Sequence, residues 1–257
     1  MVNTSGGTNP VEEPARMSRR RLFGLGAAAT AGLALASFAA ASPVSGQTSP
    51  PGTTSPAGHP ADATEAWRLL TEGNARFVQG QPSHPHQDES WRDSLVEGQN
   101  PFATVLGCAD SRVPPEVLFD QGFGDLFTIR SAGEVLDDAV VGSIEYGVEH
   151  VGTPLVVILG HAQCGAVAAA IDTVNGEGHL EGDISSLVRD VEAAVRATPA
   201  DSDPDAFFAA CVENQVRRTA AMLLERSDIV RDAVEGHGVQ IVTAVYDLET
   251  GQVNRID

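Results

Sequence analysis

The stretch from Pro154 to Leu159 reads PLVVIL, an uninterrupted apolar run in which three residues are β-branched. Such a run lacks the alternation of a half-exposed strand and is typical of a central strand in a parallel sheet, which is covered on both faces. Shorter apolar runs at Pro101–Leu106 and Leu126–Ile129 predict two more strands. Gln240–Tyr246 predicts a last long strand, with a short partner strand at Gln252–Ile256.

Helical patterns lie between these predicted strands. Apolar residues recur at helical spacing in Thr64–Phe77, and Asp137 is placed to cap a helix whose apolar face extends to Val151. Three further stretches are interpreted as helices: Gly165–Ile171, Ile184–Val195 and Asp205–Leu224. This alternation of strands and helices predicts an α/β domain with a mostly parallel central sheet flanked by helices.

Composition and charge narrow the class of protein. The chain has 257 residues, of which 42 % are hydrophobic and only 5 % aromatic, which predicts one ordinary globular domain with an aliphatic core. Its formal net charge is −19, and every basic side chain other than histidine is an arginine. Such a surface repels phosphate backbones, so we expect no nucleic-acid partner.

The N-terminal region has the pattern of an export signal. Ser18–Phe23 reads SRRRLF and is followed by an uncharged stretch rich in Ala, Gly and Leu that ends at Ala41. We interpret residues 1–41 as a twin-arginine signal peptide, with a transmembrane anchor as the alternative. Residues 42–62 are rich in Ser, Pro, Thr and Gly and predict a linker. The folded domain is then residues 63–257, exported to the periplasm or the extracellular space.

Two predicted strands end in residues that bind metal ions. Cys108–Arg112, with the sequence CADSR, follows the first strand, and His161–Gly165, with the sequence HAQCG, follows the central one. The carboxyl ends of strands in an open α/β sheet are where ligands bind. Two thiols and an imidazole suit tetrahedral Zn²⁺, and three protein ligands leave one position open, as in a catalytic zinc site. Cys108, His161 and Cys164 are therefore the candidate ligands.

Each candidate ligand also has a structural interpretation. Buried free cysteines are common in cores, and a disulfide between Cys108 and Cys164 remains an alternative for an exported protein. Zinc is favoured because thiolates loaded with metal before export would be protected from oxidation. Cys211 lies among apolar residues of a predicted helix, so we expect a core thiol there.

The two motifs also carry a resemblance to a known family. Cys108-x-Asp110-Ser111-Arg112 followed by GHxxCGA from Gly160 resembles the β-class carbonic anhydrases, and the likeness runs from about residue 63 to the end. It implies a β-carbonic anhydrase-like catalytic domain over residues 63–257, with Cys108, His161 and Cys164 as zinc ligands. It further implies that Asp110 and Arg112 form a catalytic dyad, that Gln121 lines the substrate pocket, and that the smallest assembly is a homodimer. Arg130–Glu134, with the sequence RSAGE, departs from the family pattern, in which Asn follows the Arg and also ends the run.

The chemistry of these residues supports the same activity. Zinc lowers the pKa of a bound water, and the resulting hydroxide can attack CO₂ to give bicarbonate and a proton. Asp110 could accept a hydrogen bond from this water, and Arg112 could hold the Asp110 carboxylate. The sequence therefore predicts a zinc-dependent carbonate dehydratase acting on CO₂ and bicarbonate.

Three other functions remain open at this point. The same scaffold could hydrolyse carbonyl sulfide or carbon disulfide, or it could bind zinc without catalysis. A thiol oxidoreductase or Cys-His hydrolase would need a metal-free, reactive Cys108. Two further histidines are weaker candidates for a proton shuttle: we expect a cap or surface group at His150, and nothing decides between a mobile loop residue and a shuttle at His179.

Overall fold

The computed structural model describes residues 60, 62–178 and 180–256. These residues build a five-stranded sheet in the order β2-β1-β3-β4-β5. Its strands are β1 (Ala103–Gly107), β2 (Leu126–Arg130), β3 (Leu155–His161), β4 (Gln240–Tyr246) and β5 (Val253–Arg255). The first four strands run parallel and β5 is antiparallel to β4. The predicted signal peptide and residues 42–59 of the predicted linker lie outside the described residues.

The predicted central strand is the middle of the sheet. Every residue of β3 is buried, and β3 pairs with β1 on one side and with β4 on the other. It ends two residues after the apolar run, because pairing with β4 continues to His161 opposite Tyr246. The mostly parallel α/β fold is thereby confirmed.

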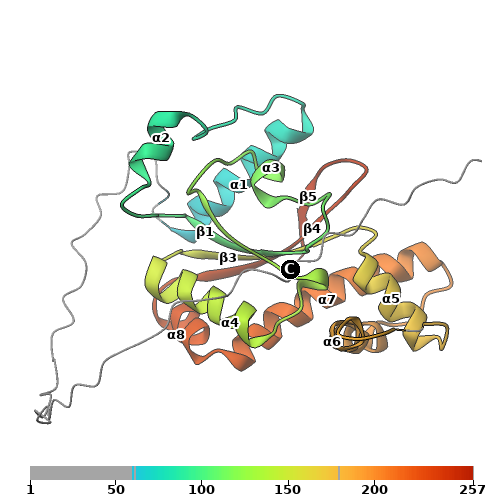
Figure 1. Cartoon of the computed structure of the whole chain (residues 1–257). Coiled ribbons are helices and arrows are strands. Elements are labelled where there is room, and N and C mark those ends of the chain that lie inside the picture. The colour runs from blue at the N-terminus through green and yellow to red at the C-terminus, as the bar shows by residue number, and fades with distance from the viewer. Residues whose placement is uncertain (1–59, 61, 179, 257) are drawn as a thin grey trace, which may run out of the picture. The chain divides into compact units, whose positions relative to one another are not determined.

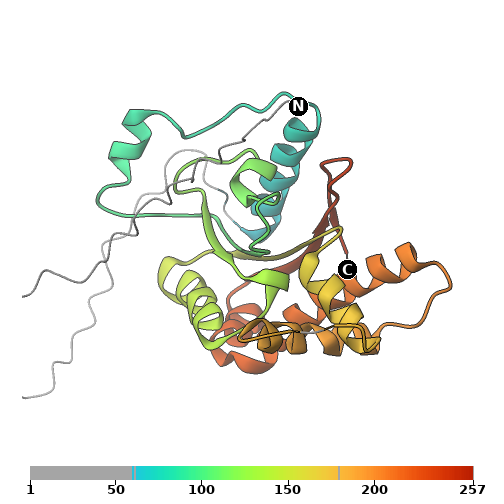
Figure 2. The same ribbon diagram turned by 45° about the vertical axis from the view of Figure 1, so that its right-hand side comes forward.

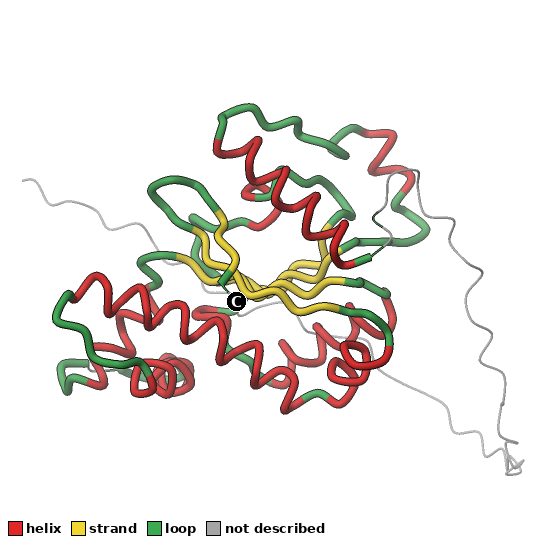
Figure 3. The backbone as a smooth tube through the Cα atoms, turned by 180° about the vertical axis from the view of Figure 1, so that it is seen from behind, coloured by secondary structure: helices red, strands yellow, loops and turns green. Residues whose placement is uncertain are grey.

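Helices cover both faces of the sheet (Figures 1, 2 and 3). One face carries α1 (Ala63–Val78) and α3 (Pro115–Leu118), and α2 (Glu89–Ser94), which has no buried residue, lies further out on the same side. The other carries five: α4 (Asp138–Glu145), α5 (Gly165–Val174), α6 (Ile184–Ala197), α7 (Pro204–Arg226) and α8 (Asp228–Gly236). In Figure 3 the strands form the thin layer between these helical layers.

Alternate residues of the inner strands explain why two layers are needed. Val105 of β1 and Val157 of β3 belong to an apolar cluster that includes Leu70 of α1. Their strand neighbours Leu106 and Ile158 belong to a second cluster, with residues of α4, α7 and α8. Because successive side chains of a strand point to opposite faces, a run that is apolar throughout is stable only when both faces are covered.

The helix that begins after Asp137 confirms its predicted cap and differs at its end. The Asp137 carboxylate accepts a hydrogen bond from the Val140 N–H at 2.7 Å, as an N-cap residue does. The α-helix ends at Glu145 and continues as a wider π-type turn over Tyr146–Val151. Gly152, at φ 84°, then terminates it, so that β3 can begin.

Three helices were not predicted from sequence. α2 and α3 are only 6 and 4 residues long, too short for a helical period to be visible. α8 follows α7 after a single residue, Ser227, which ends α7 and caps α8 by accepting a hydrogen bond from the Val230 N–H at 3.1 Å. Among the helices that the structure describes, none has both the length and the hydropathy to cross a membrane.

Candidate metal centre

The register of the sheet brings the two candidate motifs together. Gly107, the last residue of β1, lies beside Leu159 of β3, so Cys108 and His161 emerge at the same edge. One ligand atom from each of Cys108, His161 and Cys164 lies within 4.8 Å of the other two, and all three residues are buried. The predicted convergence of these residues is confirmed.

His161 is oriented as a metal ligand would be. Its Nδ1 lies 2.9 Å from the carbonyl oxygen of Ala162, an acceptor, so Nδ1 carries the hydrogen and donates it. Its Nε2 is buried and has no hydrogen-bond partner among the described residues. A buried lone pair without a partner is costly. The set of one imidazole nitrogen and two sulfurs matches the ligands that Zn²⁺ prefers, so these residues fit that ion.

Contact between the two thiols moves their pKa values in opposite directions. A hydrogen bond from Cys164 lowers the pKa of Cys108 to about 4, with help from the Gly133 N–H and against the effect of burial. The same contact raises the pKa of Cys164. All three cysteines of the chain, including Cys211, are free thiols. Because cysteines bind metal ions as thiolates, binding of a divalent metal here would release protons.

Asp110 and Arg112 form a bidentate ion pair beside these residues. Arg112 Nε donates to Asp110 Oδ1 at 3.0 Å, and Arg112 Nη2 donates to Asp110 Oδ2 at 2.7 Å. The hydrogen bonds from Arg112 hold the pKa of Asp110 well below its usual range, so the carboxylate is charged. Asp110 Oδ2 also lies 3.9 Å from His161 Nε2. The carboxylate is therefore held on one side by Arg112 and faces the candidate metal ligands on the other.

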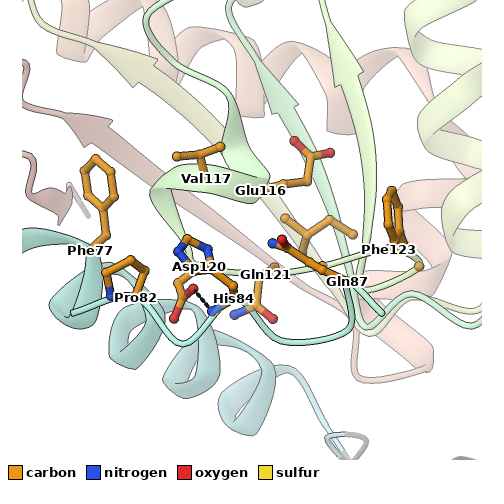
Figure 4. Close-up of a pocket in the computed structure, with 12 residues that line it drawn as sticks. Phe77, Pro82, His84, Gln87, Glu116, Val117, Asp120, Gln121 and Phe123 are labelled. Atoms are coloured by element: carbon orange, nitrogen blue, oxygen red, sulfur yellow. Dashed lines mark hydrogen bonds between the residues drawn. The ribbon is translucent and has the colours of Figure 1, made fainter. Parts of the chain in front are cut away.

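Gln121 does line a pocket, but not one that contains the candidate ligands. The pocket measures about 590 Å³ and lies beside α1 and α3 (Figure 4). Its lining includes Phe77, Val117, Gln121 and Phe123 but none of the three candidate metal ligands. The Gln121 side chain donates from Nε2 to the carbonyl oxygen of Phe119 at 2.8 Å. Within one chain, the structure therefore does not place Gln121 at the metal centre.

Glu134 is a buried acid beside the centre to which the sequence analysis assigned no role. It is 2 % exposed, and its Oε1 has no hydrogen-bond partner among the described residues. Burial, followed by the charge of Cys108, raises the pKa of Glu134 well above its usual value. The signal for it was the departure from the family pattern at RSAGE. That pattern marks the position without showing that the side chain points inward.

Gly133 explains why this turn approaches a candidate ligand. Its φ is 67°, and a side-chain carbon at Gly133 would come within 2.9 Å of the Ala166 Cβ. Because glycine alone avoids that clash, the turn can bring the Gly133 N–H to 3.3 Å from Cys108 Sγ.

The remaining candidate residues lie away from the metal centre or outside the described residues. Cys211 is fully buried in the apolar cluster that includes α1, which confirms the predicted core thiol. His150 lies in the turn before β3, at the opposite end of the strand from His161, and its ring lies 5.2 Å from that of Tyr146. His179 is outside the described residues.

Comparisons with known proteins agree with this geometry. The family model described as carbonic anhydrase matches residues 103–253. "Carbonic anhydrase 2" of Mycobacterium tuberculosis H37Rv is 44 % identical over 190 residues, which cover 73 % of this chain and 89 % of that protein. The carbonic anhydrase of Mycolicibacterium smegmatis is 44 % identical over 197 residues, covering 73 % and 90 %.

Solved structures show the same fold. A tetrameric β-carbonic anhydrase from Sordaria macrospora superimposes with a TM-score of 0.59 at 22 % identity, over 74 % of this chain and 95 % of that one. The Coccomyxa β-carbonic anhydrase in complex with acetazolamide gives a TM-score of 0.58 at 26 % identity, over 73 % and 84 %. On the family model, the sequence relatives and this fold together, the chain belongs to the carbonic anhydrase family and has the β-class architecture.

Proposed function

We propose that this protein catalyses the zinc-dependent, reversible hydration of CO₂, with Cys108, His161 and Cys164 as the metal ligands. The observation that carries the proposal is the buried Nε2 of His161, which has no hydrogen-bond partner among the described residues and lies within 4.8 Å of two thiol sulfurs. Membership of the carbonic anhydrase family supplies the reaction. Zinc bound by these residues would act as a Lewis acid that makes a water molecule nucleophilic near neutral pH.

Asp110 then has the role of orienting the attacking water. Because its carboxylate is charged, it can only accept hydrogen bonds, and Oδ2 is the oxygen nearer to His161. A hydrogen bond from the water to Asp110 Oδ2 would turn a lone pair of the water oxygen toward the carbon of CO₂. The low pKa of Asp110 means that it does not keep the proton. The proton released by hydration must therefore pass on to solvent or buffer.

Arg112 has the role of holding that carboxylate in place. Its guanidinium donates to both Asp110 oxygens and also, at 3.4 Å, to the carbonyl oxygen of Gln163 in the other motif. It therefore links the two loops that carry the candidate ligands. A planar guanidinium suits this task because its donors match the two oxygens of a carboxylate.

The test is CO₂ hydration by stopped-flow spectrophotometry together with zinc analysis. Asp110→Asn should retain zinc and lose about a hundredfold in hydration rate, the usual contribution of one positioned proton-handling group. Asp138→Asn is the matched control, because it breaks an exposed Asp–Arg pair with Arg226 away from the centre and should leave the rate unchanged. An Asp110→Asn enzyme as fast as the wild type would contradict the proposed role.

Assays on the same purified protein distinguish two alternative functions. Carbonyl sulfide and carbon disulfide offered in place of CO₂ test hydrolysis on the same scaffold. A protein that binds one zinc per chain and hydrates no CO₂ would instead be a noncatalytic zinc-binding protein.

We also propose that the protein is a homodimer or a higher homo-oligomer. Support comes from the pocket around Gln121, which is separate from the candidate ligands of its own chain and is bordered by exposed apolar side chains, Val117 at 55 % and Phe123 at 54 %. A second copy covering this face would bury these side chains and close the pocket. Sedimentation velocity should show a dimer or larger, and Phe123→Asp should shift it toward the monomer.

The N-terminal region is proposed to direct export. On this proposal residues 1–41 are a twin-arginine signal, residues 42–62 a linker, and the mature enzyme is periplasmic or extracellular. Replacing Arg19 and Arg20 by Lys should leave a folded, zinc-loaded precursor in the cytoplasm. Continued export of that variant would contradict a twin-arginine route.

A further inference from the structure

Arg130 binds the main chain of the loop that carries Cys108 and Asp110. It is the last residue of β2 and lies beside Gly107, the last residue of β1. Its Nε donates to the carbonyl oxygen of Cys108 at 2.9 Å, and its Nη2 donates to the carbonyl oxygen of Asp110. One guanidinium thus binds the two carbonyls on either side of Ala109.

The residues after Arg130 hold the first half of the same loop. The Ser131 N–H donates to the Gly107 carbonyl at 3.1 Å, and the Ala109 N–H donates to the Ser131 carbonyl at 3.2 Å. The Gly133 N–H donates to Cys108 Sγ. Cys108 therefore keeps several supports when the Arg130 side chain is removed.

Asp110 depends on Arg130 more strongly than Cys108 does. The other hydrogen bond to the Asp110 carbonyl comes from the Val113 N–H, within the same short turn. The Arg130 guanidinium is what ties the Asp110 main chain to the neighbouring strand. Both of these hydrogen bonds of Arg130 are directed at this loop. Among the described residues no carboxylate forms an ion pair with it.

We propose that Arg130 is a positioning residue for Asp110. By holding the carbonyls of Cys108 and Asp110 together, it fixes the main chain from which the Asp110 carboxylate reaches toward His161. It acts through Asp110 and does not touch substrate. The proposal rests on the proposed function of Asp110. A guanidinium suits the task because its donors are spread over a rigid plane and can reach two acceptors at once.

A double-mutant cycle tests this coupling. Arg130→Met keeps the aliphatic stem and removes the donors. It should lower kcat/KM for CO₂ hydration by about tenfold with zinc content unchanged, the lower end of the effect of removing a supporting partner of a metal site. In the Asp110→Asn background the same substitution should cost less than about twofold, because residues that act as a unit are not additive. Arg130→Lys should recover part of the loss. A tenfold loss that persists in the Asp110→Asn background would overturn the proposal.

Arg226→Met is the matched control. Arg226 also donates to a main-chain carbonyl, that of Leu136, but at the end of α7. The same substitution there removes the same kind of hydrogen bond and should leave kcat/KM unchanged. An equal loss of kcat/KM in Arg226→Met would mean that the Arg130 effect reflects general loosening of the fold, and would contradict a specific role.

Hydrogen–deuterium exchange separates failure of this proposal from failure of the proposed function. The amides of Ala109, Arg112 and Val113 are hydrogen-bonded in the wild type. Exchange in a peptide spanning residues 108–113 should be several-fold faster in Arg130→Met and unchanged in Arg226→Met. If Asp110→Asn hydrates CO₂ at the wild-type rate, the role of Asp110 is wrong, yet faster exchange still supports Arg130 as the residue that fixes this loop. Unchanged exchange overturns the proposal whatever the activity.

Discussion

Two aspartate–arginine pairs in this protein have the same chemistry and different surroundings. Asp110 pairs with Arg112 beside the metal centre, and Asp120 pairs with Arg76 between α1 and the loop after α3. The Asp120 side chain is 1 % exposed and accepts from Arg76 Nε, the Ser83 N–H and hydroxyl, and the His84 N–H, at 2.6 to 2.9 Å. The Asp110 side chain is 18 % exposed, and its hydrogen bonds all come from Arg112.

The difference shows that exposure and orientation, and not the ion pair itself, make a carboxylate available for chemistry. Burial raises the pKa of Asp120, but the hydrogen bonds from Ser83, Arg76 and His84 outweigh it and bring that pKa to about 2. Both carboxylates are therefore charged at neutral pH. Asp120 Oδ2 accepts three hydrogen bonds and Oδ1 one, within a fully buried side chain, whereas Asp110 Oδ2 accepts one and lies 3.9 Å from His161 Nε2. The contrast supports a structural role for Asp120 and the proposed functional role of Asp110.

The largest expected effect tests whether the neighbourhood of Asp110 is a metal centre at all. Cys108→Ser and Cys164→Ser should each lose zinc and all measurable hydration, because a hydroxyl is a much poorer zinc ligand than a thiolate. Cys211→Ser changes a buried thiol of the core and should keep both properties. The measurement is zinc per chain by atomic emission together with the hydration rate. Zinc loss in Cys211→Ser with retention in the other two would reverse the assignment.

The structural role of Asp120 predicts a large loss of stability on substitution. Asp120→Asn should lower the free energy of unfolding by about 3 kcal/mol, because it removes the charge from a buried carboxylate that accepts four hydrogen bonds. Asp110→Asn should lower it by less than about 1 kcal/mol, because a partly exposed pair contributes little. Urea unfolding of the two zinc-loaded variants measures the difference. Equal losses would remove the distinction between the pairs.

The pKa of Asp120 also predicts an acid-dependent loss of stability. Its pKa is lowered from the usual 3.8 to about 2 on folding, so its contribution is present above pH 3.8 and is lost as the pH falls toward 2. The stability of the wild type should therefore decline more steeply over this range than that of Asp120→Asn. Urea midpoints at pH 4, 3 and 2.5 compare the slopes. Parallel slopes would show that Asp120 does not carry this dependence.

Removing the arginine of each pair tests the same comparison by its effect on the hydration rate. Arg112→Ala should reduce hydration about tenfold or more at pH 7, because Asp110 is then no longer held in place for the reacting water. It also becomes free to compete for the open metal position, so the activity should recover in part as the pH rises and hydroxide competes more effectively. Rate–pH profiles of Arg112→Ala and Arg76→Ala provide the comparison. A profile of Arg112→Ala parallel to that of the wild type would argue against release of Asp110.

The smallest expected effect concerns Glu134, a buried acid whose Oε1 has no hydrogen-bond partner among the described residues. Because its pKa is raised above the usual 4.5 on folding, its contribution to stability is present below pH 4.5 and declines as the pH rises toward its folded-state pKa. Glu134→Gln keeps the shape and removes this dependence, and should raise the free energy of unfolding by about 1 kcal/mol at pH 8. Urea unfolding of the zinc-loaded protein at pH 5 and pH 8 checks the sign. A gain that is equal at both pH values would exclude ionisation of Glu134 as the cause.

Much of the fold was predictable because its signals lie in neighbouring residues. The apolar run of β3, the cap at Asp137 and the period of α1 are each contained within one element. The convergence of Cys108, His161 and Cys164 followed as well, because residues that end parallel strands meet at one edge of the sheet. α8 (Asp228–Gly236) was missed, because the predicted helix ended at Leu224 and the 9 residues of α8 are too few for a helical period to stand out.

The sequence by itself therefore determined the layers of the sheet and the donor set of the metal centre. Only the tertiary structure decided that Glu134 is buried with no partner for its Oε1 among the described residues, that Gln121 lines a pocket apart from its own chain's metal centre, and that Arg130 binds the loop of Asp110. The physical reason is the range of the interactions. Hydrophobic periodicity and capping act within one element. Which residues, 20 or more positions away along the chain, a side chain contacts is set by how the elements pack.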